Sequence, residues 1–318
     1  MKKMGFISFI IAFDILVGLG NPAKVLAGDG LKIKIKTWPT QKVFLVKEPI
    51  WLKVTVWNKS TLPQKVGELD LGLRIPEVFL LDSQGNRLNN VGLKGDKLPV
   101  GETLILSPSD SFVKYIPLFY YFGVPGKVRA LISGGPLVFP PGNYWLFIRT
   151  QGKGGDYWES QITSDTVNFE VKYPIGDEGK ALEELYDCMR FANEYHLKGK
   201  TIEDLAMKYR EVLRKYPKTV YGVLLQADLS AFFSPGVRPS LPREILSRYD
   251  EQDLLETKLL IEKYPDSPFA AENVSKLLKS YKILGRVQDG NEFIKLLASE
   301  KPNTLSGKEA TKVLKTIK

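Results

Sequence analysis

The residues of this chain that are best suited to chemistry are few. Its 318 residues include one histidine, His196, and one cysteine, Cys188. A metal site built from several histidines therefore cannot form, and a single thiol cannot close a disulfide within the chain. A Ser-His-Asp triad would have to use His196, which is followed by Lys198 and Gly199 and has no nucleophile motif beside it. From these residue types we expect no catalytic residue, no metal and no cofactor.

Two further kinds of reactive site depend on particular loops or on paired carboxylates. The glycine clusters at 134–136 and 152–155 lack the preceding strand and following helix of a phosphate-binding loop. Acidic pairs such as Asp29 with Glu48 cannot be placed together or apart from the sequence alone. We therefore predict that the protein is not an enzyme, with a two-carboxylate hydrolase as the weaker alternative.

Two tryptophans are candidates for binding rather than catalysis. In the alternating segment 50–57, Trp51 and Trp57 share one strand face, and aliphatic residues occupy the other face. Exposed together, the two rings would form a platform for sugar rings or a peptide, which is the basis of an alternative carbohydrate-binding or adhesive function. The competing interpretation is that they cover the second face of the sheet or a junction with the rest of the chain.

Two arginines are candidates for contact with a partner. Arg210 and Arg214 lie one helical turn apart in the segment 201–216, opposite its apolar stripe. Guanidinium groups at this spacing suit pairing with carboxylates. The competing interpretation is a solvated helix surface.

The first residues of the chain resemble a secretory signal. Residues 1–27 begin with lysines, continue through the apolar run 5–20 and end with a short Val-Leu-Ala sequence, so cleavage is expected after Ala27. The run contains Asp14 and is too short for a typical membrane span. We expect an exported protein, periplasmic or extracellular, with no transmembrane span in the mature chain.

The next part of the chain, residues 28–173, is predicted to be all β. Apolar residues alternate with lysines at 31–36, and the segment 50–57 also alternates, so each is expected to be a strand with one buried face. Further short apolar runs follow with no helical period between them, which is typical of a β-sandwich. The motif Lys47-Glu48-Pro49-Ile50 and the turn Pro141-Gly142-Asn143-Tyr144 resemble parts of bacterial immunoglobulin-like domains. This resemblance implies an immunoglobulin-like β-sandwich in which the tyrosine hydroxyl closes a corner onto nearby backbone.

The last part, residues 178–318, is predicted to be all helical, because the apolar period changes from two to 3.6 residues after Pro174. The segment 213–222 recurs at 261–270, and both copies place a Tyr-Pro turn between two helices. A weaker third copy begins at 300–304.

Capping residues are expected to start the second helix after each turn. Thr219 and Ser267 are the expected caps in the first two copies, and Ser306 with Glu309 is expected to form a capping box in the third. The recurring unit resembles the tetratricopeptide-like helical hairpins of envelope proteins that assemble complexes. This resemblance implies a multidomain protein whose second domain binds another protein, usually through a concave face lined by the first helices.

Composition allows a second kind of partner. The chain carries a formal net charge of +9, which favours anionic partners such as acidic cell-envelope polymers. We expect no nucleic acid. The function predicted from sequence is therefore that of an exported, non-catalytic adaptor or scaffold that binds another envelope protein, with acidic polymers as further candidate ligands.

Overall fold

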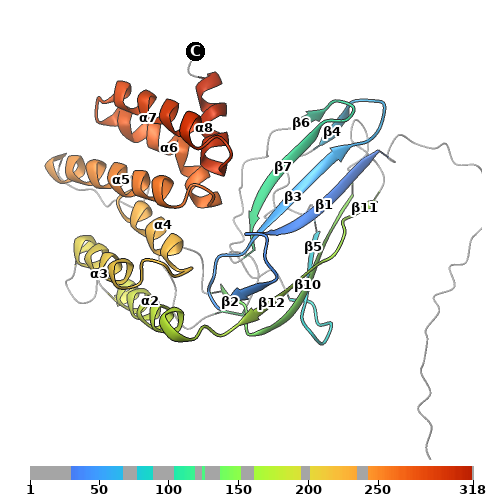
Figure 1. The fold of residues 1–318 in the computed structure, drawn as a ribbon, viewed down its shortest axis with the longest axis horizontal. Helices are drawn as coiled ribbons and strands as arrows, with labels where there is room; N and C mark the ends of the chain where they lie inside the picture. Colours follow the sequence, from blue (N-terminus) through green and yellow to red (C-terminus); the bar gives the residue numbers. More distant parts are fainter. Residues whose placement is uncertain are drawn as a thin grey trace, which may run out of the picture.

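Strands make up the first part of the structure and helices the second, as Figure 1 shows. The computed structural model describes residues 30–66, 77–88, 104–118, 124–125, 137–151, 161–194, 201–234 and 243–316. The predicted signal peptide, residues 1–27, lies outside the described residues. We call the described residues up to Lys172 the β region and those from Gly176 onward the helical region. All-β followed by all-α is the order that the sequence predicts.

The first sheet contains three antiparallel strands in the order β1-β3-β7. They are β1 (Leu31–Trp38), β3 (Trp51–Asn58) and β7 (Ser111–Pro117). The predicted alternation of β1 is confirmed, because its apolar residues are buried and the three intervening lysines are exposed. The aliphatic residues of β3 are also buried, as expected for strands with one face toward a core.

The second sheet is built around β10 (Gly142–Gln151). Strands β12 (Val167–Lys172) and β11 (Gln161–Thr163) pair with successive parts of β10, and β5 (Glu77–Leu81) pairs along its other edge. Strand β2 (Val43–Leu45) then pairs with β12 in parallel. Two short ladders complete the described strands, β4 (Gln64–Val66) with β6 (Leu104–Leu106) and β8 (Val124–Pro125) with β9 (Leu137–Val138).

Both sheets contribute to one apolar core. Leu52 of the first sheet and Leu80 and Leu146 of the second are almost inaccessible to water. The backbone N–H of Ile35 donates to Asp165 Oδ1 near the second sheet. The predicted corner is confirmed, because the Tyr144 hydroxyl donates to the carbonyl oxygen of Pro140 over 2.6 Å.

The helical region follows after a linker of only a few residues. Its helices are α2 (Gly176–Glu194), α3 (Ile202–Lys215), α4 (Gly222–Phe232), α5 (Arg243–Lys263), α6 (Pro268–Ile283), α7 (Val287–Glu300) and α8 (Leu305–Thr316). At the start of α3, Thr201 and Asp204 form a capping box. Cys188 is fully buried, as expected for a core thiol. Among the described residues, no helix is both long enough and apolar enough to span a bilayer.

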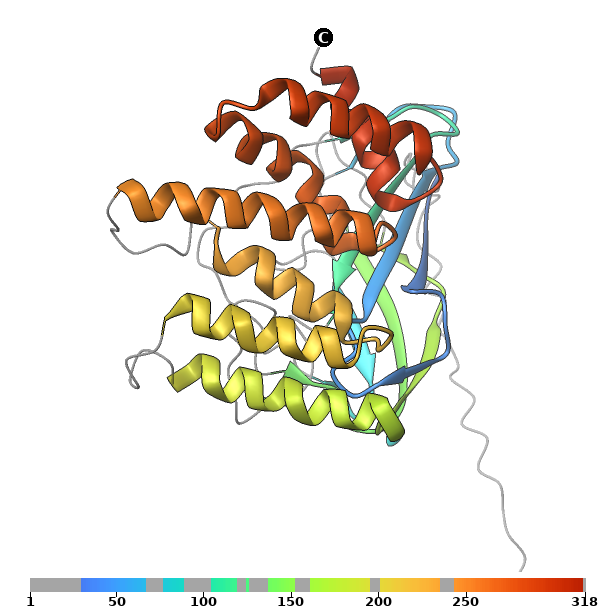
Figure 2. The same cartoon turned by 60° about the vertical axis from the view of Figure 1, so that its left-hand side comes forward.

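Three helix pairs, α3/α4, α5/α6 and α7/α8, are joined by turns with the same backbone hydrogen bonds. At the end of each first helix, the N–H of Tyr216, Tyr264 or Lys301 donates to the carbonyl four residues earlier. The N–H of the residue three positions further on, Thr219, Ser267 or Thr304, then donates to the carbonyl of that tyrosine or lysine. Figure 2 shows the helices of this region stacked one above another. The weak third copy thus has the same turn geometry as the first two.

The predicted caps of the second helices are partly wrong. Thr219 lies within the turn, because α4 begins only at Gly222. Ser267 is at the N-cap of α6 but makes no capping bond with its side chain. At α8 the cap is Thr304, whose Oγ1 accepts from the N–H of Gly307, while the N–H of Ser306 donates to the carbonyl of Pro265 in the preceding turn.

Candidate functional site

The starts of the second helices pack against the β region. The Tyr221 side chain just before α4 is fully buried, and its hydroxyl donates to the Val46 carbonyl over 2.8 Å. Phe269 in the first turn of α6 packs edge-on against Trp51, with ring centroids 4.9 Å apart. Tyr221 and Phe269 hold equivalent positions after the first two turns. Equivalent residues of successive helix pairs therefore bind successive parts of the β region.

Charged groups also meet at this junction. Lys47 has a left-handed backbone (φ 68°), and burial lowers the pKa of its ammonium to about 8, an effect that the charge of Asp228 on α4 opposes. Burial also raises the pKa of Glu48, which accepts hydrogen bonds from Gln41 Nε2 (2.7 Å) and from the N–H of Leu45 (2.8 Å). The charge of Lys47 thus faces that of Asp228 on α4, whereas Glu48 accepts its hydrogen bonds within its own loop.

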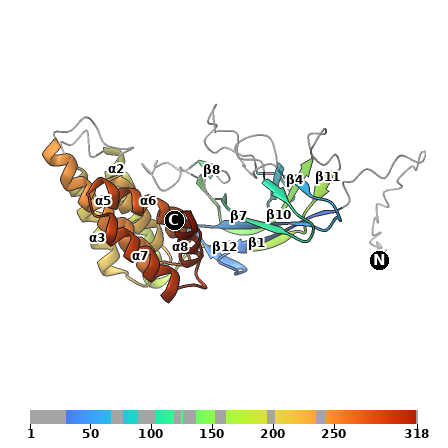
Figure 3. The same ribbon diagram turned by 90° about the horizontal axis from the view of Figure 1, so that it is seen from above.

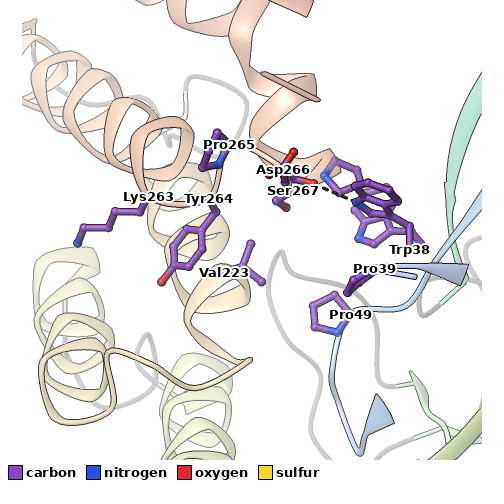
Figure 4. Close-up of a pocket in the computed structure, with 11 residues that line it drawn as sticks. Trp38, Pro39, Pro49, Val223, Lys263, Tyr264, Pro265, Asp266 and Ser267 are labelled. Carbon is purple, nitrogen blue, oxygen red and sulfur yellow. Dashed lines mark hydrogen bonds between the residues drawn. The ribbon is translucent and has the colours of Figure 1, made fainter. Parts of the chain in front are cut away.

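A groove opens beside these contacts, and Figure 4 shows it between the two regions. It is lined by Trp38, Pro39, Pro49 and Trp51 of the β region and by Val223 and residues 263–268 of the helical region. Its volume is about 350 Å³. The Trp38 Nε1 donates to the Asp266 carbonyl over 2.9 Å at one side of the groove. The walls are mainly apolar rings, so this junction groove suits apolar contact rather than bond-making chemistry.

A second and more polar groove, here called the lysine groove, lies between β7 and the helices α6 and α8. Its volume is about 530 Å³. It is lined by Lys53, Phe112, Val113, Lys114, Tyr115, Pro268, Ala271, Glu272, Leu305, Lys308, Glu309 and Lys312. Lysines thus enter the groove from both the sheet and α8.

Two carboxylates share the lysine groove. The Glu272 side chain is exposed, yet the neighbouring groove walls remove enough solvent to raise its pKa to about 7, an effect that Lys114 opposes. Glu309 Oε2 instead forms an ion pair with Lys312 Nζ over 2.8 Å. Four lysines line the same space, which makes the groove better suited to holding an anion than to acid–base chemistry.

The predicted tryptophan platform does not form. Trp51 is only 2% exposed because α6 covers it through Phe269. Trp57 is half-buried at the other end of β3. The prediction that both rings face solvent together is therefore wrong for Trp51, and the competing interpretation of a junction residue applies to it.

The two predicted arginines have different environments. Arg210 Nε donates to Glu256 Oε1 over 2.9 Å, and its guanidinium also donates to Gln252 Oε1 over 2.8 Å. Glu256 is buried and accepts a further bond from Gln226 Nε2, so Arg210 neutralises a carboxylate that would be costly to bury alone. Arg214 is exposed and pairs with no described residue. Sequence reasoning missed Glu256 because its partners are on other helices.

Two observations bear on ligands directly. Within the part of the chain that the structure describes, no three or more His, Cys, Asp or Glu side chains are grouped to hold a metal ion. The surface of the helical region carries exposed large apolar side chains on α3, α5 and α7, namely Met207 (63% exposed), Leu255 (47%) and Leu296 (52%).

Comparison with known proteins adds little to these observations. No protein-family model matches the sequence, and no curated protein matches it. Among solved structures, a β-glucosidase from Listeria innocua in complex with gluconolactone aligns over 46% of this chain, with 18% identity and a TM-score of 0.23. This chain spans only 17% of that enzyme. The protein ycdA of Bacillus subtilis aligns over 82% of both chains, with 13% identity and a TM-score of 0.20. These similarities are too low to assign a fold family or a function.

Proposed function

We propose that this protein is an exported, non-catalytic adaptor or scaffold of the cell envelope, whose helical region binds another protein. The observation that carries the proposal is the junction, where Tyr221 and Phe269 bind the β region at Val46 and Trp51. These contacts hold the helices in one orientation, and a rigid surface loses less entropy when a partner binds.

Strand order supports an immunoglobulin-like assignment for the β region. One sheet has the order β1-β3-β7, and the other has β5 and β12 on either side of β10, with β2 parallel to β12. Here the chain passes from β1 in the first sheet to β2 in the second. In an immunoglobulin-like sandwich the first strand is divided between the two sheets in the same way. The bond from Tyr144 to Pro140 resembles the tyrosine corner of such sandwiches, in which the hydroxyl donates to backbone a few residues upstream.

Three helix pairs with matching turns support a tetratricopeptide-like assignment for the helical region. In such arrays the partner binds to the first helices, which here are α3, α5 and α7. Met207, Leu255 and Leu296 each expose an apolar side chain on one of these helices. Contiguous apolar surface, rather than single exposed side chains, marks a protein interface, so the proposal requires these three side chains to lie on one face of the array. We call these three residues the first-helix surface.

Photo-crosslinking in the organism of origin tests this proposal. A photoreactive amino acid is placed at Met207, Leu255 or Leu296 of the full chain, and a matched control places it at Leu62, an exposed apolar residue of the β region. The expected result is one and the same protein crosslinked from all three helical positions and not from Leu62. Absence of any adduct, or equal adducts from Leu62, would overturn the proposal.

Export is tested separately by fractionation and by sequencing the N-terminus of the purified protein. We expect the mature chain to begin at Gly28, directly after Ala27. A chain that keeps residues 1–27 and stays in the cytoplasm would contradict the envelope assignment.

A further inference from the structure

The outer face of the first sheet carries a row of positive charge. Lys32, Lys34 and Lys36 alternate along β1 and all point away from the core; we call them the lysine row. Alternate residues of a strand are roughly 6.6 Å apart on one face. In the register of β1 with β3, Lys36 lies opposite Lys53, so the row continues onto the neighbouring strand.

The lysines of β1 are not paired with a described carboxylate. Lys32, Lys34 and Lys36 are exposed, and no ion pair joins them to a residue that the structure describes. The Lys53 ammonium lies over the rings of Trp38 and Tyr115, at 5.6 Å and 5.9 Å from their centroids. Cation–π contact fixes the position of an ammonium and leaves its charge in place.

The row leads into the lysine groove. Lys53 lines this groove together with Lys308 and Lys312 on α8, and Figure 2 shows the C-terminal helices beside the strands of the first sheet. Figure 3, seen from above, also shows α8 at the end of the β region. Lysines therefore continue from the edge strand β1 into the groove beside α8, where Glu309 pairs with Lys312 and Glu272 also lines the wall.

The chemistry of this path favours one class of ligand. No arginine lines the groove or stands on the outer face of β1. Arginine is the residue of choice where a carboxylate or a phosphate is held in a fixed bidentate geometry, whereas lysine binds phosphate as a point charge and leaves its orientation free. Lysines that repeat along a strand suit a linear polymer that carries negative charges at regular intervals. A flat membrane could contact β1 but could not enter the groove beneath α8.

We propose that the lysine row and the lysine groove together form a binding site for a linear polyanion with repeating phosphate groups. Lys32, Lys34 and Lys36 hold the polymer along the sheet, and Lys53 with the α8 lysines holds the part that enters the groove. The half-buried Trp57, opposite Lys32 in the register, offers an apolar surface for the uncharged segments between phosphates. This site is separate from the first-helix surface, so one protein can hold a polymer and a protein partner together.

Salt dependence of binding tests the proposal with the full mature chain. The probes are a synthetic poly(glycerol phosphate) and inorganic polyphosphate, with polyglutamate and vesicles of anionic phospholipid as the other arms. The test variant is Lys32→Gln/Lys34→Gln/Lys36→Gln. The matched control removes three lysines of the helical region that are also exposed and have no ion pair with a described residue, as Lys279→Gln/Lys282→Gln/Lys295→Gln. Circular dichroism checks that both variants fold.

The expected result follows from counterion release. Each phosphate contact contributes about 0.7 to the slope of log Kd against log salt for a single-stranded polymer. Loss of three contacts should lower that slope by about 2, so the change in Kd between 50 and 200 mM salt becomes about 18-fold smaller. The control variant should keep the wild-type slope. Equal losses in both variants, no effect of the test variant, or tighter binding of polyglutamate or vesicles than of both phosphate polymers would overturn the proposal. The ratio of the two phosphate-polymer affinities distinguishes a polyol phosphate from a bare polyphosphate.

Discussion

Removal of one hydroxyl at the junction tests whether the β region and the helical region unfold as one unit. Tyr221 belongs to the helical region, and its hydroxyl donates to the buried carbonyl of Val46 in the β region. Tyr221→Phe keeps the ring and leaves this carbonyl without its partner. A buried acceptor left unpaired costs roughly 1–3 kcal/mol. We therefore expect the free energy of unfolding to fall by about 2 kcal/mol.

Chemical denaturation followed by two signals measures this change in each region. All five tryptophans lie before residue 174, so their fluorescence reports on the β region, whereas far-ultraviolet circular dichroism reports mainly on the helices. If the junction couples the regions, the two transitions coincide in the wild type, and Tyr221→Phe moves both midpoints together. A fluorescence midpoint that stays at the wild-type value while the helical midpoint falls would refute the reasoning.

Tyr144→Phe is the matched control for this experiment. It also removes a buried hydroxyl that donates to a backbone carbonyl, that of Pro140, but both partners lie within the β region. Its effect gives the cost of losing such a bond in this protein. Tyr221→Phe should have a comparable effect on tryptophan fluorescence, even though the substituted residue lies in the other region.

Three further substitutions test local features of the fold. Thr201→Ala removes the capping box with Asp204 and should destabilise the protein by about 1 kcal/mol; Thr201→Ser should restore most of this loss in urea denaturation. Gly307→Ala would place a Cβ against the backbone carbonyl of Lys301 and should cost roughly 1–3 kcal/mol through overpacking, visible as a lower melting temperature. Glu272 has a carboxyl pKa of about 7 in the folded chain, above the ordinary 4.5. The folded state thus binds more protons between these values, and the contribution of Glu272 is most favourable below pH 4.5 and is lost as pH rises through 7. Glu272→Gln should therefore raise the melting temperature relative to wild type more at pH 8 than at pH 5; an equal effect at both values would contradict the raised pKa.

Local patterns predicted the secondary structure well. The alternation in β1 and the capping box at Thr201 depend on residues that are close in sequence, so the sequence alone identifies them. The predicted cap at Ser306 is wrong because α8 begins at Leu305, so Ser306 lies inside its first turn, where its N–H donates to the carbonyl of Pro265. Thr304, two residues earlier, then supplies the cap.

The binding residues were harder to predict, because their environments depend on distant parts of the chain. The orientation of Trp51 on the outer face of β3 followed from alternation, but its burial depends on Phe269 of α6. Arg210 was correctly placed on a helix surface, yet its partner Glu256 is 46 residues away on α5. The lysines of β1 were also visible in the sequence, but the groove beneath α8 follows only from the packing of the two regions.

The recurring turn is followed, at equivalent positions, by residues that contact the β region. Position 221 is a tyrosine whose buried hydroxyl finds the Val46 carbonyl, while the equivalent position 269 is a phenylalanine that faces the ring of Trp51 and needs no hydrogen bond. The polarity of each residue thus matches its own contact on the β region, as buried groups require. At the third turn the equivalent residue, Ser306, instead joins the second turn through its backbone, which brings α8 over the lysine groove. The same three turns thus stack the helices and set α8 beside the lysine groove. It follows that substitutions at the junction should weaken simultaneous binding of a polymer and a protein partner more than binding of either one alone.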